Sequence, residues 1–514
     1  MQSRRDQVQA HLFVMGRLSS SMLRGDPDTP DAPESRNWRG VMGGVVLAAL
    51  AAVGVALYGL IVPGTTSSWR TPGALVLVSG TSSRYLYVGD ALHPVLNEAS
   101  AKLLAGTQMS VHTVSARSLA GTPHGAPVGI QGAPDMLPGS GDGLYDGTWW
   151  ACAGSTADTS GGAARSTLQV SAGQVSGGRG LTAGQAALVS SPDGRTQMLW
   201  QGRRYPLDTA HGVPAALGWS GEAPYRVGDA FLDTLPAGPS VAPPEVAGRG
   251  SAGPALSGAP TRYGQVFTAT GGQHLLLTKA GLVPLTPLLY DVVIGDPRTQ
   301  AQAYQGGAVT ARTIGAADLA AHQAPASAGT ALAQGLPESA PRLVTAGTGQ
   351  DVCSAVSPGG SAPTTTVSIV DRAAVPSAVA DTEPGVQPGC LAADGVTVPA
   401  GEGALVRGLS SAGWGAYEYL VTDAGVAYPL TADGAKQLGY SDAAAVALPT
   451  AWLQLLPSGP RLDPSVLADG GVVREQAGAP ACGAPRAGRH AGPVREPRRG
   501  PPARERPRRR RPER

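Results

Sequence analysis

The chain has 514 residues, which is enough for several domains. Its 72 Gly and 45 Pro residues approach the level at which disorder becomes possible, but an apolar content of 42% is enough for packed cores. The net charge of +2 hides an asymmetry, because residues 471–514 carry 13 Arg and 4 Glu. The remainder is therefore mildly acidic, which argues against a nucleic-acid-binding surface.

Residues 5–24 predict an amphipathic helix that ends near Asp26-Pro27, since the residue before a proline avoids the helical conformation. Its apolar residues recur at three- and four-residue intervals, the spacing of one helix face: Val8, Leu12, Met15, Leu18 and Met22. The helix either lies on lipid headgroups, aided by its arginines, or docks to a cytoplasmic partner. The periodicity does not choose between these alternatives.

Residues 41–62 form an apolar run, VMGGVVLAALAAVGVALYGLIV, without a charge or a proline. A helix of this length spans the roughly 30 Å hydrocarbon core of a bilayer. The run starts too late and is too long for a cleaved signal peptide, so we predict an uncleaved transmembrane anchor. Six arginines precede it and only Arg70 lies in the 20 residues after it, which places residues 1–40 in the cytoplasm and the bulk of the chain outside.

A short pattern occurs twice beyond the apolar run. Tyr205-Pro206-Leu207 and Tyr428-Pro429-Leu430 each follow a strand-like segment and a turn, and each precedes Leu-Gly-aromatic and Leu-Pro-x-Gly-Pro. The matched order and spacing over about 45 residues indicate a duplication. Two weaker copies contain His93-Pro94-Val95 and Val283-Pro284-Leu285.

Each copy is read as a strand, a turn, a proline-containing return segment and a short helix, so each buries one face against its neighbours. Residues 471–514 are expected to be a disordered Arg/Pro-rich tail, with binding to an anionic polymer and a reading-frame error as alternatives. We expect repeats near 72–125, 196–245, 263–320 and 415–470, and a central β-rich domain from parts of 145–195 and 345–414.

No catalytic constellation is found. None of the three lysines follows a glycine, so the chain has no Walker A loop. A Gly-x-Ser-x-Gly elbow and a His-Glu-x-x-His pair are also missing from the sequence. The four cysteines, Cys152, Cys353, Cys390 and Cys482, have no metal-site spacing, and three disulfide pairings are open to them. We expect no catalytic, cofactor-binding or metal site.

Several short stretches follow one another in a specific order. They are DQVQAH at 6–11, GDP at 25–27, the apolar run, PGALV at 72–76, HPVLN at 93–97, SLAG at 118–121 and GAPD at 132–135. In this combination, over about residues 4–470, the chain resembles the EccB component of type VII (ESX) secretion systems.

The resemblance implies a single-pass membrane protein with four extracytoplasmic repeats around a central β-rich domain. It maps a structural disulfide onto Cys152 and Cys353 and leaves Cys390 as an extra thiol. The implied partners are EccC, EccD and EccE, a nearby mycosin protease and further copies of the chain. Members are often labelled ATP hydrolases, so ATP enters by that label only.

We therefore predict an α+β, single-pass protein of the inner membrane with an elongated extracytoplasmic region. The leading hypothesis is a structural core subunit of a type VII secretion complex, which assembles through its cytoplasmic helix and its repeats. The alternatives are a membrane-anchored peptidoglycan-binding protein and an extracytoplasmic ATPase with a non-standard site.

Overall fold

The computed structural model describes residues 4–24, 34–61, 67–156, 165–173, 175–359, 362–378, 384–410 and 413–474. By its internal contacts the chain divides into two compact units, one with residues 1–90 and 111–123 and the other with residues 91–110 and 124–514. The link at 25–33 and residues 475–514 of the tail expected at 471–514 lie outside the described residues. Residues 472–473 of that expected tail instead form a short strand.

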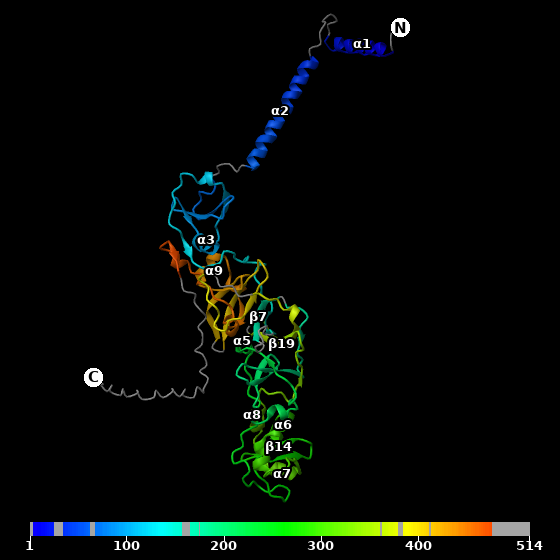
Figure 1. The fold of residues 1–514 in the computed structure, drawn as a ribbon, viewed down its shortest axis with the longest axis vertical. Coiled ribbons are helices and arrows are strands. Elements are labelled where there is room, and N and C mark those ends of the chain that lie inside the picture. Colours follow the sequence, from blue (N-terminus) through cyan, green and yellow to red (C-terminus); the bar gives the residue numbers. More distant parts are fainter. Residues whose placement is uncertain are drawn as a thin grey trace, which may run out of the picture. The chain divides into compact units, whose positions relative to one another are not determined.

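Two long helices begin the first unit (Figure 1). Helix α1 (Arg4–Arg24) confirms the predicted amphipathic helix, and its apolar side chains are exposed. Helix α2 (Glu34–Ile61) begins seven residues before the predicted run, since residues 34–40 contain no proline to stop it and Glu34 suits a helix N-terminus. Within α2, Trp38–Tyr58 is long and apolar enough to cross a membrane.

The sheet of the first unit has a parallel strand pair beside an antiparallel one. Strand β1 (Ala74–Val78) pairs antiparallel with β2 (Arg84–Val88) and parallel with β4 (Val111–Val114), and a 3-10 turn, η1 (Ala116–Leu119), follows. The fully buried Trp69 packs edge-on against Tyr87, with ring centroids 5.4 Å apart. This contact anchors the chain that enters β1 to the sheet.

The second unit repeats this strand arrangement three times. In each copy the first strand pairs antiparallel with the second, the second pairs with the third, and the fourth lies parallel beside the first. The copies are β9 (Gln185–Ser190), β10 (Thr196–Trp200), β11 (Arg203–Pro206) and β12 (Tyr225–Arg226); β13 (Val266–Ala269), β14 (His274–Thr278), β15 (Gly281–Pro284) and β16 (Arg312–Ile314); and β21 (Ala404–Ser410), β22 (Gly413–Val421), β23 (Ala427–Leu430) and β24 (Val446–Pro449).

A helix lies between the third and fourth strand of each copy, as a parallel pairing requires a crossover connection. In chain order we call the copies repeats one to four, repeat one being β1 and β2 with β3 (Ala91–Pro94), its helix and β4. The helices are α3 (Glu98–Ala105), α4 (Val213–Ala216), α6 (Pro287–Gly295) and α9 (Ala432–Leu438).

Two of the repeats begin one strand before the starts expected near residues 196 and 415. Strands β9 and β21 are the first strands of repeats two and four. The shared Tyr-Pro-Leu motif marks the third strand of a repeat, whereas the first strands of the repeats have no sequence motif in common.

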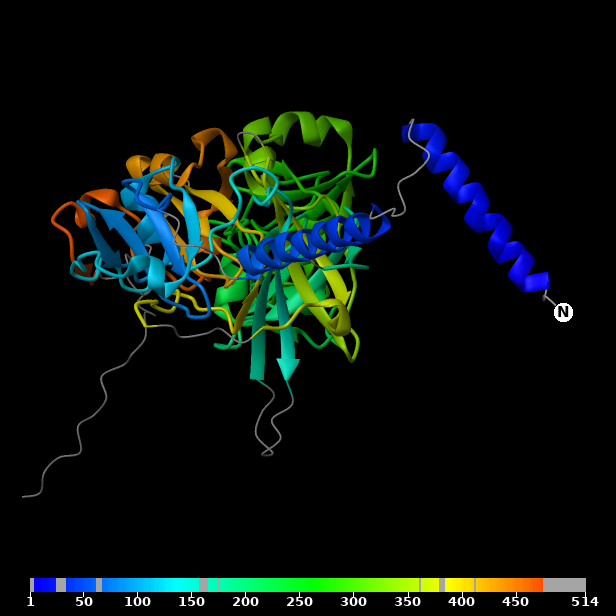
Figure 2. The same ribbon diagram turned by 90° about the horizontal axis from the view of Figure 1, so that it is seen from above.

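The central sheet draws its strands from two distant parts of the chain. Figure 2 shows β6 and β7 beside β18 and β19, and β6 pairs antiparallel with β18. The sheet order is β20-β7-β6-β18-β19-β8. Its strands are β6 (Trp149–Thr156), β7 (Arg165–Ala172), β8 (Arg179–Gly180), β18 (Gln350–Ser357), β19 (Thr364–Asp371) and β20 (Gly395–Thr397). The predicted α+β class, with a β-rich region assembled from two segments, is confirmed.

Shorter elements complete the second unit, and two of them extend existing strands. Strand β17 (Arg342–Leu343) pairs parallel with β9, and β25 (Val472–Val473) pairs parallel with β5 (Gly129–Ile130). The others are α5 (Asp229–Asp233), the π-helical turn η2 (Thr299–Ala303), α7 (Ala316–His322), α8 (Ala326–Ala333), η3 (Arg372–Ala374), η4 (Asp442–Ala444), α10 (Thr450–Leu453) and η5 (Pro464–Leu467).

A partly buried hydroxyl group links repeat two to the central sheet. The Tyr225 hydroxyl donates to the carbonyl oxygens of Ala153 and Gln350, at 3.2 Å each. Nearby, Arg372 Nε donates to Asp351 Oδ1 at 2.8 Å. Burial raises the pKa of the Asp351 carboxyl above its ordinary value, even though Arg372 acts in the opposite direction.

Candidate functional site: paired repeats and an acidic pocket

The repeat helices pack in two pairs inside the second unit. Helix α3 of repeat one contacts α9 of repeat four (Figure 1), and α4 of repeat two contacts α6 of repeat three. The second pair is very close, because a Cβ built on Gly295 would lie 2.4 Å from Cβ of Ala216. Each helix therefore buries a face against another repeat, as expected for modules that cannot form a core alone.

The side chain of the residue before the shared proline packs against a glycine near the end of the same repeat. A Cβ on Gly238 would lie 2.4 Å from Cε1 of Tyr205, and one on Gly459 would lie 2.1 Å from Cε1 of Tyr428. Both glycines belong to the Leu-Pro-x-Gly-Pro motif. The motif therefore needs glycine because an aromatic ring occupies the space of a side chain.

The two weaker copies follow the same rule. In repeat one, His93 takes the ring position and a Cβ on Gly125 would lie 2.2 Å from its Cε1. In repeat three the ring is replaced by Val283, and Ala324 takes the place of the glycine. The backbone bonds are equivalent in all four repeats, with N–H to carbonyl distances of 2.8 to 3.0 Å from Gly125 to Leu92, Gly238 to Arg204, Ala324 to Leu282 and Gly459 to Ala427. Only the smaller valine leaves room for a methyl group.

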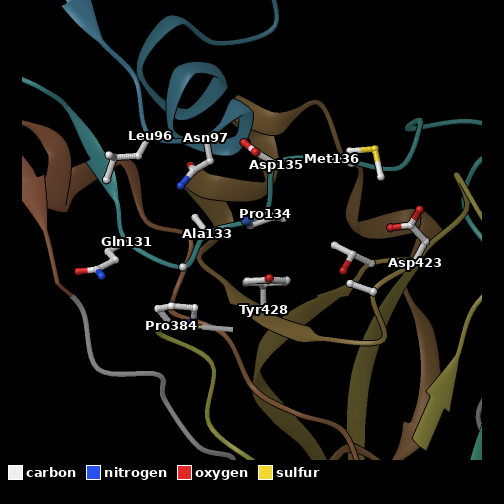
Figure 3. A pocket seen from close by; sticks show the side chains of 13 residues that line it. Leu96, Asn97, Gln131, Ala133, Pro134, Asp135, Met136, Pro384, Asp423 and Tyr428 are labelled. Atoms are coloured by element: carbon white, nitrogen blue, oxygen red, sulfur yellow. The ribbon is translucent and has the colours of Figure 1, made fainter. Parts of the chain in front are cut away.

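A pocket of about 400 Å³ lies where repeat four meets the start of α3. Figure 3 shows Asn97 and Asp135 along one side of it and Tyr428 and Pro384 along the other. Its lining residues are Leu96, Asn97, Gln131, Gly132, Ala133, Pro134, Asp135, Met136, Pro384, Thr422, Asp423, Ala424 and Tyr428. The pocket is thus shared by segments more than 300 positions apart in the sequence.

Asn97 holds one wall of the pocket in place. It is the N-cap of α3, where its Oδ1 accepts a hydrogen bond from the backbone N–H of Ser100 at 3.0 Å. Its Nδ2 donates to the carbonyl oxygen of Ile130 at 2.8 Å. The cap therefore fixes the 131–136 segment against the helix, and that segment forms most of the wall.

The pocket is acidic. Asp135 and Asp423 line it, and none of its lining residues is Lys, Arg or His. Asp423 accepts a hydrogen bond from the backbone N–H of Gly401 at 3.0 Å. Thr422 is only 2% exposed, and its Oγ1 has no hydrogen-bond partner among the described residues. The lining of the pocket is therefore negatively charged.

The expected disulfide pair lies in the central sheet. Cys152 on β6 is directly opposite Cys353 on β18, and the two form a disulfide. Cys390 is also disulfide-bonded, so the expectation that it is an extra thiol is wrong. Within the described ranges, no cluster of three or more His, Cys, Asp or Glu residues could hold a metal ion.

The sequence did not predict the pocket, although some of its lining residues belong to two of the motifs. Leu96 and Asn97 end HPVLN, and Asp135 ends GAPD, but these motifs were used only for the repeat pattern and the resemblance. Thr422 and Asp423 lie in a turn of repeat four that looks like ordinary turn chemistry. Only the packing of α3 beside repeat four brings these residues together.

Residues 1–468 match the family model described as type VII secretion system ESX-1, transport TM domain B, or EccB. The chain belongs to the EccB family. The predicted family is therefore confirmed, and this family is a membrane component of type VII secretion systems.

Two relatives in this family are ESX-3 proteins. The ESX-3 secretion system ATPase EccB3 of Mycobacterium tuberculosis (strain ATCC 25618 / H37Rv) is 32% identical over 272 residues, which is 52% of this chain and 49% of the relative. The protein of the same description from Mycolicibacterium smegmatis is 30% identical over 301 residues, 55% of this chain and 56% of the relative. The chain spans about half the length of the curated relatives it matches.

Solved structures share the fold. A chain in the intact ESX-5 inner membrane complex has a TM-score of 0.58 at 24% identity, covering 90% of this chain and 95% of that one. A chain of the EccB3 dimer from the ESX-3 core complex also has a TM-score of 0.58 at 24% identity, covering 76% of this chain and 98% of that one. The similarity therefore extends over both units of the EccB-family chain.

Proposed function

We propose that this chain is a structural core subunit of a type VII secretion membrane complex and that it supports protein export. The family match over residues 1–468 is the single observation that carries the proposal. The architecture agrees with it, since one apolar helix precedes a body built of packed modules. Such modules supply surfaces for assembly rather than a reaction centre.

We propose that α2 anchors the chain, with α1 in the cytoplasm and the second unit outside. The support is the charge bias, because arginines flank α2 on its N-terminal side and only Arg70 follows closely on the other. The buried disulfide of the central sheet agrees with an oxidising compartment. A cysteine placed in β22 should react with a membrane-impermeant maleimide in spheroplasts, and one placed in α1 should not.

We propose EccC, EccD and EccE as membrane partners, a mycosin protease as a neighbour, and self-association through the repeats. One related structure is titled an EccB3 dimer, which supports self-association of this chain by analogy. The exposed apolar face of α1 is a second surface for assembly, because it has no contact with the rest of the described chain that would cover it.

We propose that the chain uses no cofactor and does not hydrolyse ATP, although its relatives carry that activity in their names. The pocket is lined by two carboxylates and by no basic residue, so it would repel a triphosphate. Purified full-length chain should release phosphate from ATP no faster than the buffer does. Turnover above that background would overturn this part of the proposal.

Complementation tests the assembly role. Cells that lack the gene should recover export with the full chain but not with a variant lacking residues 4–24, which keeps α2 and therefore still inserts. Immunoblots of membrane fractions check insertion. Normal export from the variant would remove α1 from the proposal, and normal export from cells lacking the gene would refute the role itself.

A further inference from the structure

The junction of repeats two and three brings a histidine close to the end of a neighbouring helix. His211 directly precedes Gly212, the N-cap of α4 in repeat two. A Cβ built on Gly212 would lie 3.6 Å from the carbonyl oxygen of Gly295, the last residue of α6 in repeat three. Because the C-terminus of a helix carries partial negative charge, a positive charge at His211 would stabilise this end of α6.

The ring of His211 is held in this place by its own repeat. Its Nδ1 lies 2.6 Å from Oδ2 of Asp208, and the backbone N–H of His211 donates to Oδ1 of the same carboxylate at 3.2 Å. Asp208 is itself fixed, since its backbone N–H donates to the carbonyl oxygen of Val241 at 3.1 Å. The side chain of His211 is 33% exposed, so protons from the solvent can reach it.

A carboxylate attached to repeat three interacts with this histidine. Glu245 precedes Val246, which lies in the apolar core of repeat three, and Arg298 Nη1 donates to Glu245 Oε1 at 2.7 Å. Arg298 holds the pKa of the Glu245 carboxyl below its ordinary value, and His211 acts in the same direction. A charge on His211 therefore acts across the junction, on a group of the other repeat.

The charges at the junction do not balance without the histidine. Asp296, the C-cap of α6, is fully buried, and it pairs with Arg249 Nη1 at 3.2 Å and with Arg298 Nε at 3.1 and 3.2 Å. We call the charged groups around His211 the junction cluster: Asp208, Glu245, Asp296, Arg249 and Arg298. Its three carboxylates and two guanidinium groups have a net charge of −1 while His211 is neutral, and protonation of His211 brings the total to zero.

We propose that protonation of His211 tightens the junction of repeats two and three. The charged ring neutralises the junction cluster and adds positive charge beside the C-terminus of α6, so the closed junction binds the proton more tightly than an opened one. By linkage, the closed junction is then more stable at lower pH. Histidine is the side chain whose charge ordinarily changes between pH 5 and 8, so the response falls in that range.

Hydrogen–deuterium exchange of the detergent-solubilised full chain tests this. After correction for the intrinsic exchange rate, protection of the α6 backbone amides should be about fivefold higher at about pH 5 than at about pH 8. His211→Gln should give the lower protection at both pH values, and His211→Lys should give the higher protection at both. A ring that acts only through its packing would lose protection in both variants, whatever their charge.

Two controls isolate the effect. His322→Gln removes a histidine on α7 and should leave the pH response of α6 unchanged. Helix α9 belongs to repeat four, which contains no histidine, and its protection should not change between the two pH values.

The comparison of His211→Lys with wild type at about pH 8 decides the matter even if His211→Gln folds poorly, because the lysine should raise protection about fivefold there. Protection of α6 in wild type that does not rise on acidification would overturn the proposal. So would a pH response that persists in a folded His211→Gln variant, or a lysine variant no better protected than wild type at about pH 8.

Discussion

Gly238→Ala tests the pairing of ring and glycine that defines the repeats. The new methyl carbon would lie 2.4 Å from Cε1 of Tyr205, so the ring must retreat by about 1 Å to reach an ordinary contact. Tyr205 is 2% exposed and packs against Trp200, with ring centroids 5.7 Å apart, so it has little room to move. We expect a loss of about 2 kcal/mol in the free energy of unfolding, typical of overpacking.

Thermal unfolding of the detergent-solubilised full chain measures the effect. A loss of about 2 kcal/mol lowers the midpoint by about 2–3 °C if the repeats and the central sheet unfold together. Gly459→Ala should cost at least as much, because its contact with Tyr428 is 2.1 Å. The control is Gly221→Ala, which meets nothing within 4 Å and should change stability by less than about 1 kcal/mol.

Tyr205→Val/Gly238→Ala copies the pair that repeat three already has, Val283 with Ala324. Tyr205→Val alone should cost about 3 kcal/mol through the cavity it leaves. The double variant should be no less stable than this single one, since the added methyl group enters the vacated space. If the two single losses add in full, the methyl group does not clash with the ring and the explanation of the motif is wrong.

Three further changes give separate expectations. Asp351→Asn should remove a pH dependence of stability. The raised pKa of Asp351 means that the folded chain binds this proton more tightly than the unfolded chain, so wild-type stability falls as pH rises from the ordinary pKa of Asp through the raised one. Urea titrations of the two proteins over this pH range should show the slope in wild type and not in the variant. Arg372→Gln should lower the free energy of unfolding by about 2 kcal/mol in the same titrations, because the buried carboxylate of Asp351 would lose its charged partner. An unchanged midpoint would mean that the pair contributes nothing to stability. Cys152→Ser/Cys353→Ser should cost about 5 kcal/mol by the chain-entropy estimate for a separation of 201 residues. Equal unfolding midpoints for this variant and wild type would contradict that estimate.

The sequence predicted those features that depend on a single stretch of the chain. The apolar run and the three- and four-residue spacing of residues 5–24 depend on single helices, so both were found. The Tyr-Pro-Leu motif located the repeats because its tyrosine ring makes a close contact with a glycine of the same repeat. The first strands β9 and β21 were not assigned to their repeats, since apolar strands have similar sequences wherever they pair.

Features that depend on distant packing were not predictable in this way. The pocket joins Asn97 to Thr422 only because α3 packs beside repeat four, and no local pattern reports that contact. Similarly, Val472 and Val473 pair with Gly129 and Ile130 in a two-residue strand that is too short to be recognised from the sequence. The acidic character of the pocket was therefore visible only after folding.

The most direct measurement of the central claim is blue-native electrophoresis of membranes solubilised from cells that express the tagged full chain. The account predicts that the tagged chain migrates in one large complex together with EccC. In a strain that lacks the gene, EccC should no longer migrate in a complex of this size. A tag that migrates as a lone protein or a simple dimer, with the EccC complex intact in the deletion strain, would contradict it.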